Sequence, residues 1–311
     1  MNGSPSARRL LLVPILSAVC LLGASCGKSG ASLPCRIPDH ELAEILRDVS
    51  DCVAQGPRFS GSPGAEKTAE WIRDRIAAAG RSAAPDVFTD RTPLGPAVFR
   101  NVILDVPGRS DRFLVIGAHY DTKYFPPDVA FQGANDGASG VAALLAVIRS
   151  LKGRTPELGL RFIFFDGEEA RFSYGPSDGL HGSRHAVEKL RQTGELSRCR
   201  AMILLDMVGD RELRLSLPSD TPPFLADAAR TAAARLGKDG LVGVSDTAMV
   251  DDHVPFRTAG IPSIDLIDFH YGPGNGYWHT SEDSLDKISA ESIRTAGELV
   301  LEMIRILEEE P

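Results

Sequence analysis

The sequence predicts an α/β protein in which helices sandwich a mostly parallel or mixed central sheet. Strand-like apolar runs alternate with helical segments along the chain, and this alternation is typical of such a sandwich. Of the 311 residues, 43% are hydrophobic and 24% are charged, so the chain can bury a full core. We expect a single domain over residues 41–311, a size that single α/β domains reach.

The predicted elements follow in a definite order. Residues 41–54 and 64–79 carry helical periodicity, and we expect the two helices to form one layer. Residues 97–106 and 111–118 are strand-like, with a PGRSD turn between them, and the nearly all-apolar segment 139–151 predicts a buried helix. We further expect strands at 160–165, 201–208 and 263–267, and helices at 182–192, 223–236 and 290–308.

Residues 1–25 have the pattern of an export signal. Two arginines precede an apolar stretch at 10–22 that is too short to span a bilayer comfortably. The segment LLGASC resembles the lipoprotein processing box of bacteria, so a lipid on Cys26 and plain cleavage nearby are both open. We expect an exported protein, periplasmic, membrane-anchored through that lipid or secreted, with residues 26–40 as a tether.

Three cysteines remain in the mature chain beyond Cys26, namely Cys35, Cys52 and Cys199. No CxxC or Cys/His cluster occurs, so these thiols are poor candidates for zinc ligands. One disulfide among the three and three inert buried thiols are the two open interpretations. The net charge of −8, without a long basic run, argues against nucleic acid as a partner.

Side chains of the metal-binding type follow several apolar runs. His119 ends the run FLVIGAH, Glu168 and Glu169 follow LRFIFF, and Asp206 follows AMILL. In open α/β sheets, ligands and active sites collect at the carboxyl ends of the strands. Because Glu168 and Glu169 are adjacent, we predict that one carboxylate binds a metal and that its neighbour transfers protons.

Asp136, Glu169 and His279 supply a ligand set for zinc, which takes imidazole nitrogen and carboxylate oxygen from about three protein ligands in catalytic sites. Taken alone, Asp136 in GANDGASG is better explained as a helix cap, and His279 as a satisfied core histidine. The combination favours a metal site, because unpaired carboxylates are costly after so apolar a strand.

The motifs resemble those of the family that unites zinc-dependent aminopeptidases with the animal-type glutaminyl cyclases. HYDTKYF, GANDGASG, FFDGEEA, LLDMVGD and YWHTSEDSLDKIS carry the resemblance, which covers essentially the whole mature chain. It implies a zinc-aminopeptidase-like catalytic domain with zinc at the positions of Asp136, Glu169 and His279. In two-zinc peptidases, the positions of His119 and Asp206 complete a second site that Asp136 bridges.

Several segments resemble the glutaminyl-peptide cyclotransferase branch, namely HYDTKYF, YGPSDGLHGSRH and DDHVPF. The resemblance implies that Glu168 is the general acid/base and that Asp251 joins Glu168 and Asp206 in a catalytic network. It also implies that Trp278 and Tyr174 wall a substrate pocket. Peptidases usually carry a small residue at the position of Asp251.

Other features favour the peptidase branch. GANDGASG is closer to the peptidase form of its block, and Asp265 stands where animal cyclases have histidine. All five ligand types of a two-zinc peptidase are present, but cyclases also retain them while using one zinc. The ligand count therefore does not separate the two branches.

The sequence thus predicts a zinc-dependent glutaminyl-peptide cyclotransferase, which converts the N-terminal glutamine of peptides to pyroglutamate and releases ammonia. An exported zinc aminopeptidase with two zincs is the alternative, and it needs an activated water nucleophile. Both interpretations predict peptides with a free N-terminus as substrates. A noncatalytic exported binding module is a third interpretation, which predicts a damaged ligand set that this chain does not have.

Overall fold

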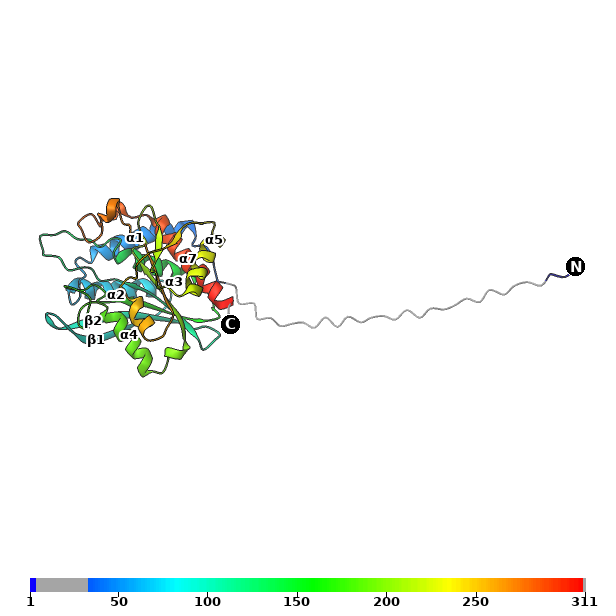
Figure 1. Ribbon diagram of the computed structural model, residues 1–311, viewed down its shortest axis with the longest axis horizontal. Helices are drawn as coiled ribbons and strands as arrows, with labels where there is room; N and C mark the ends of the chain where they lie inside the picture. The colour runs from blue at the N-terminus through cyan, green and yellow to red at the C-terminus, as the bar shows by residue number, and fades with distance from the viewer. Residues whose placement is uncertain (4–32, 310–311) are drawn as a thin grey trace. The chain divides into compact units, whose positions relative to one another are not determined.

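A six-stranded mixed sheet with the strand order β1-β2-β4-β3-β5-β8 lies at the centre of the computed structural model (Figure 1). The structure describes residues 1–3 and 33–309. The chain divides into two units, Met1–Gly30 and Ala31–Pro311, and the second contains every helix and strand given below. The predicted signal segment 1–25 and Cys26 lie outside the described residues, apart from residues 1–3.

The four strands β3, β4, β5 and β8 are parallel, and the remaining two are antiparallel. The strands are β1 (Ala84–Thr92), β2 (Gly95–Val106), β3 (Phe113–His119), β4 (Gly159–Phe165), β5 (Cys199–Asp206) and β8 (Ser263–Ile267). A separate two-stranded sheet pairs β6 (Leu215–Leu217) with β7 (Val242–Val244). The predicted mixed α/β architecture is therefore confirmed.

Helices cover both faces of the central sheet. One face carries α1 (Leu42–Ala54), α2 (Pro63–Ala78), α3 (Ala138–Ser150), α5 (Pro223–Arg235) and α7 (Ala290–Glu309), whose apolar side chains share one core. The other face carries α4 (His181–Gln192) and α6 (His253–Thr258), with a smaller core. Four 3-10 helices lie at Asp39–Glu41, Leu196–Arg198, Pro273–Asn275 and Leu285–Lys287.

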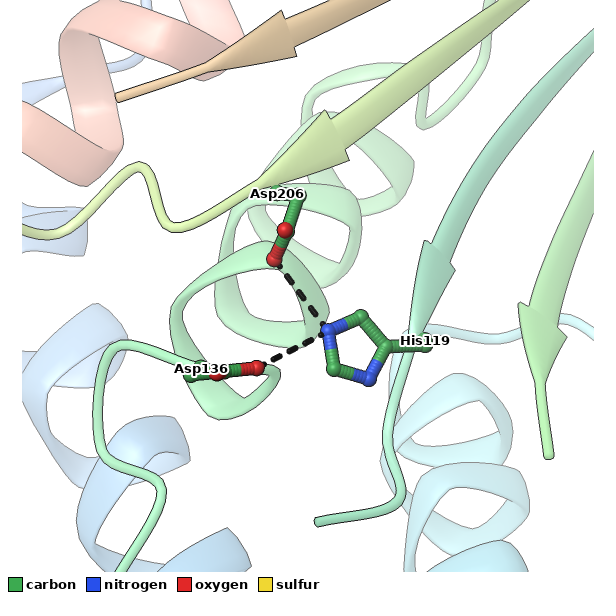
Figure 2. Close-up of side chains that lie close together, drawn as sticks. All are labelled: His119, Asp136 and Asp206. Atoms are coloured by element: carbon green, nitrogen blue, oxygen red, sulfur yellow. Dashed lines mark hydrogen bonds and ion pairs between the residues drawn. The ribbon is translucent and has the colours of Figure 1, made fainter. Parts of the chain in front are cut away.

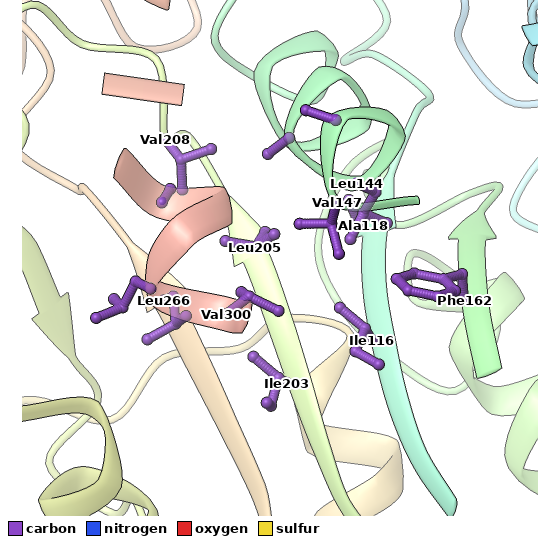
Figure 3. Close-up of a cluster of buried hydrophobic side chains, with 14 of the residues drawn as sticks. Ile116, Ala118, Leu144, Val147, Phe162, Ile203, Leu205, Val208, Leu266 and Val300 are labelled. Carbon is purple, nitrogen blue, oxygen red and sulfur yellow. The ribbon is translucent and has the colours of Figure 1, made fainter. Parts of the chain in front are cut away.

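The alternation of side chains along β3 explains why both faces need helices. Ile116 and Ala118 point into the larger core beneath α3 (Figure 3). Val115, directly before Ile116, belongs to the smaller core on the other face. All seven residues of the strand are buried, as expected for a central parallel strand covered on both sides. Helix α3 is buried from Ala138 to Ile148 because it lies between the sheet, where it contacts β3 and β5, and the helices α1 and α7.

The structure corrects the expected tether and decides between the two interpretations of the cysteines. Residues 33–40 are not a free tether, because Leu33 and Ile37 are buried in the core and the Ile37 backbone N–H donates to Glu298 Oε1 at 3.0 Å. Burial of these two apolar side chains, together with the hydrogen bond to Glu298, holds the segment against the domain. No disulfide forms among Cys35, Cys52 and Cys199, which are all free thiols, and the last two are buried.

The predicted strands and helices all form, with ends that differ from the expected ones by a few residues at most. The sequence did not predict β1, an edge strand whose Val87 is exposed and whose polar residues break the apolar alternation. The three-residue strands β6 and β7 and the six-residue helix α6 are too short for a periodic pattern. Over the described residues, none of the helices has both the length and the apolar character needed to cross a membrane.

The substitution Gly140→Ala tests the close approach of α3 to the sheet. A Cβ at this position would lie 2.6 Å from the carbonyl oxygen of Leu205 and 3.0 Å from Cβ of Ala118. We expect the free energy of unfolding to fall by about 1–3 kcal/mol from overpacking, although alanine normally stabilises a helix relative to glycine. Urea unfolding measures the change.

Gly243→Ala is the matched control, because its Cβ would have no neighbour closer than 3.7 Å, from the carbonyl oxygen of Leu215. We expect its free energy of unfolding to stay within about 0.5 kcal/mol of the wild-type value. A Gly140→Ala protein as stable as this control would contradict the packing described here.

Candidate metal centre and active site

Three neighbouring parallel strands deliver most of the candidate residues to one edge of the sheet. Strand β3 ends at His119, β5 ends at Asp206, and β4 is followed closely by Glu168 and Glu169. Since β3 pairs with β4 on one side and β5 on the other, their carboxyl ends lie side by side. The sequence-based expectation about where these four side chains lie is correct.

Asp136 reaches the same edge from the loop before α3. The carboxylate of Asp283 fixes this loop by accepting the backbone N–H of Asn135 at 2.7 Å and of Asp136 at 3.2 Å. The peptide bond between Asp136 and Gly137 is cis. Glycine is required next, because a Cβ at Gly137 would lie 2.7–2.8 Å from the backbone oxygen and ring of His119.

His279 comes from a loop near the C-terminal end and has a left-handed backbone conformation, with φ of 55°. Its ring stacks on that of Trp278, with 4.1 Å between the centroids and 20° between the planes. A positive φ is costly for a residue other than glycine and is concentrated at functional sites. The loop therefore holds this imidazole in a defined position.

Asp136 belongs to two sets of three side chains, one with His119 and Asp206 and the other with Glu169 and His279. Its Oδ1 lies 3.3 Å from Nε2 of His119, which is also 3.2 Å from Oδ1 of Asp206 (Figure 2). Its Oδ2 lies 3.2 Å from Nε2 of His279, which in turn lies 3.0 Å from Oε1 of Glu169. In each set, one ligand atom from each of the three residues lies within 4.8 Å of the others.

The donor set fits zinc. Two histidines and three carboxylates converge, and all five except the partly exposed His279 are at most 9% exposed. The carboxylate atom Glu169 Oε2 and the imidazole atom His119 Nδ1 are buried without a hydrogen-bond partner. Burial raises the pKa of Glu169, and the nearby charge of Asp136 raises it further, so a cation bound among these carboxylates would favour their ionised forms. These residues would hold zinc through nitrogen and oxygen.

Glu168 lies beside the ligands but belongs to neither set. Burial raises the pKa of its carboxyl well above the usual value, and the charge of Glu169 adds to this effect. The carboxylate of Asp121 accepts the backbone N–H of Glu168 at 3.0 Å and of Glu169 at 3.2 Å. The backbone at the two residues is therefore fixed, so that the side chains of a ligand and an adjacent proton carrier leave it from defined positions.

A cavity of about 490 Å³ opens onto this cluster. It is lined by Glu168, Asp206 and Asp251, which were predicted to be catalytic, and by Trp278 and Tyr174, which were predicted to wall the substrate pocket. Asp136, Glu169 and His279 line the same cavity. His119, although in contact with Asp136 and Asp206, is not part of the lining and lies deeper.

Asp251 lies in a second buried group of polar side chains with His253 and Asp265. Burial raises the pKa of Asp251 well above its usual value, and the charges of Asp265 and Glu168 raise it further. The backbone N–H of Asp252 donates to Asp251 Oδ1 at 2.5 Å. Asp251 therefore faces the cavity as a carboxyl that favours its protonated form.

The sequence interpretation did not find the residues that support the ligands. Asp283, which also accepts a hydrogen bond from Tyr271 Oη at 3.1 Å, stands inside the quoted block YWHTSEDSLDKIS. Lys123, from HYDTKYF, lies with its Nζ 3.4 Å from Glu169 Oε2 and donates to the Ala170 carbonyl at 2.6 Å. Both stand in motifs, but their partners are backbone groups or distant residues, which sequence spacing does not show.

The fold and the donor set define a zinc-dependent α/β enzyme. The chain belongs to peptidase family M28, whose model matches residues 101–304. It is 30% identical to the glutaminyl-peptide cyclotransferase of Bothrops jararaca, over 92% of this chain and 83% of that protein. It is 31% identical to the glutaminyl-peptide cyclotransferase of Bos taurus, over 78% of this chain and 76% of that protein.

Solved structures from both branches are similar. A glutaminyl cyclase from an Acidobacteriales bacterium is 36% identical, with a TM-score of 0.82 over 93% of this chain and 99% of that one. A leucine aminopeptidase precursor from Bacteroides thetaiotaomicron is 27% identical, with a TM-score of 0.76 over 86% of this chain and 98% of that one. The fold is therefore shared by cyclases and exopeptidases.

Zinc binding should stabilise the protein, because it places positive charge among buried carboxylates. We expect chelation to lower the unfolding temperature and zinc to restore it. Asp136→Asn should weaken zinc binding by about tenfold or more, since it removes the charge that both ligand sets share. Thermal unfolding during a zinc titration measures both effects.

The control is Asp128→Asn, which changes an exposed acid outside the ligand sets. Its zinc-dependent shift should equal that of the wild type. An unchanged shift in Asp136→Asn would show that zinc binds elsewhere.

Proposed function

We propose that this chain is a zinc-dependent glutaminyl-peptide cyclotransferase, acting on peptides with a free N-terminal glutamine. The observation that carries the proposal is the place of Asp251. Its carboxyl is 4% exposed and lines the cavity together with the proton-carrying candidate Glu168. The similarity to glutaminyl cyclases over nearly the whole chain supports the same reaction.

The reaction makes one bond and breaks one within a single residue. The α-amine nitrogen bonds to the γ-carbonyl carbon of glutamine, and the bond from that carbon to the amide nitrogen breaks to release ammonia. When bound by Asp136, Glu169 and His279, zinc supplies a Lewis acid for the γ-carbonyl oxygen. Because nucleophile and electrophile belong to one residue, positioning supplies much of the rate.

Glu168 is placed to manage the protons. Its carboxylate takes a proton from the attacking α-amine and gives one to the departing ammonia, a use that its raised pKa favours. Asp206 and Asp251, on the same cavity, stabilise the nitrogen that becomes ammonia by accepting hydrogen bonds or sharing a proton. No water nucleophile takes part.

The cavity suits one small amide side chain. Its volume of about 490 Å³ is in the range of small-molecule sites, and Met249, Ile267, Phe269 and Trp278 form an apolar wall. The Phe269 and Trp278 rings meet edge to face at 4.9 Å between centroids. This wall limits the access of water to the reacting amide.

An aminopeptidase is the second candidate, and one observation favours it. His119 and Asp206 form a complete second ligand set with Asp136, as a two-zinc peptidase requires. In that reaction Glu168 would serve as the base for a water molecule. We favour the cyclase, and with it a single zinc, because cyclisation gives the buried carboxyl of Asp251 a role at the leaving nitrogen and hydrolysis does not.

We also propose that the chain is exported through residues 1–25 and carries a lipid on Cys26 or is cleaved nearby. The support is the sequence pattern alone. Labelling with a palmitate analogue that depends on Cys26 would support the membrane-anchored form, and Cys26→Ala is the matched variant.

The activity test compares a glutaminyl peptide with a leucyl amide, using the zinc-loaded protein from about residue 28 onward. We expect ammonia release and a product lighter by one ammonia from the glutaminyl peptide, with the leucyl amide intact. Hydrolysis of the leucyl amide without cyclisation would instead establish the aminopeptidase.

Asp251→Asn should lower kcat for cyclisation by roughly a hundredfold, because the amide cannot exchange a proton with the leaving nitrogen. Steady-state kinetics measure the change, with zinc content as the check on the metal site. Asp246→Asn, an exposed acid outside the cavity lining, should behave as wild type. Equal kcat values in the two variants would show that Asp251 takes no part in the reaction.

A further inference from the structure

Tyr174 touches Glu168 with its phenol oxygen. Its Oη donates a hydrogen bond to Glu168 Oε1 at 2.9 Å, whereas the sequence alone assigned Tyr174 only to the wall of the pocket. Although Tyr174 is 41% exposed as a whole, partial burial of the phenol raises its pKa, and the Glu168 carboxylate adds to this, so the hydroxyl remains a proton donor. The contact joins a cavity residue directly to the proposed proton carrier.

The segment that carries Tyr174 is fixed by Asp178. The carboxylate of Asp178 accepts three successive backbone N–H groups, from Arg171 at 2.5 Å, Phe172 at 2.8 Å and Ser173 at 3.1 Å. Charge-assisted bonds of this kind are stronger than neutral ones. The loop before Tyr174 therefore has one defined backbone path.

The turn after Tyr174 is equally constrained. Gly175 and Asp178 exchange backbone hydrogen bonds of 2.9 and 3.3 Å, and Arg184 Nη1 from α4 donates to the Gly175 carbonyl at 3.0 Å. Gly179 has a φ of 72°, and a Cβ there would lie 2.6 Å from Cδ1 of Tyr174 and 2.9 Å from the Glu168 carbonyl. The ring is thus packed against the backbone beside Glu168.

We propose that Tyr174 is a positioning residue that orients the carboxylate of Glu168 for proton transfer. The last torsion of a glutamate side chain is broad, so a carboxylate without a fixed partner samples many orientations. With Oε1 held by the phenol, Oε2 is the oxygen that exchanges protons with the substrate nitrogens. This inference rests on the proposed cyclase function and deepens it.

The direct test is Tyr174→Phe, which keeps the ring and removes the hydroxyl. Loss of a hydrogen bond to a charged group should lower kcat for a glutaminyl substrate about tenfold, with KM changed less than about twofold and zinc content unchanged. A kcat decrease of less than about threefold would overturn the positioning role. So would a change in KM alone, which would leave Tyr174 as a wall of the pocket.

A second test loosens the loop before Tyr174 and leaves the tyrosine itself unchanged. Asp178→Asn should also lower kcat, but it should add little to Tyr174→Phe in the double variant, because both act through the same hydrogen bond. Additive effects would contradict this connection. Phe172→Ala is the control from the same loop, with a side chain that is 70% exposed and outside the cavity lining, and its kcat should equal that of the wild type.

The wild-type protein in the same assay separates the two proposals. Cyclase activity of the wild type with an unchanged kcat in Tyr174→Phe would overturn the positioning role alone. A wild type that does not cyclise glutaminyl substrates would overturn the proposed function itself.

Discussion

The site depends on a single shared carboxylate. Asp136 contacts both His119 and His279, so two loops and a strand that are far apart in the sequence meet at one side chain. Its position follows from the Asp283 carboxylate beneath it and from a glycine that lets the chain pass His119. Burial alone would raise the pKa of Asp136, but hydrogen bonds from the two histidines lower it, so the carboxylate stays ionised. A buried carboxylate of this kind is stabilised by positive charge beside it. A zinc ion bound here would supply that positive charge, so metal binding would also stabilise the fold.

The sheet supplies the rest of the geometry. Because β3 lies between β4 and β5, side chains that follow three apolar strands converge without any long connection. The buried helix α3 supports these strands from one face, and α4 leads back from the Glu168 loop on the other. Acids that are costly to bury are thus held by a rigid frame, and their raised pKa values are a consequence of that burial.

Much of this could be predicted from sequence. Long apolar strands and helices leave a clear periodic signal; His119 and Asp206 end such strands, and Glu169 follows one closely. The edge strand β1 gave no such signal, because its polar residues break the apolar alternation. The supporting roles of Asp121 and Asp283 could not be predicted, because their partners are backbone N–H groups on other loops. The hydroxyl contact of Tyr174 likewise depends on how Asp178 folds its loop, which no residue pattern reveals.

The central claim is that zinc binds at Asp136, Glu169 and His279, with Glu168 left free to carry protons. The most direct measurement is the zinc content and zinc affinity of wild type, His279→Ala and His119→Ala, determined by competition with a chelating indicator. We predict one tightly bound zinc in the wild type, lost in His279→Ala and retained in His119→Ala. Two tightly bound zincs in the wild type, or loss of the first zinc in His119→Ala, would contradict the account.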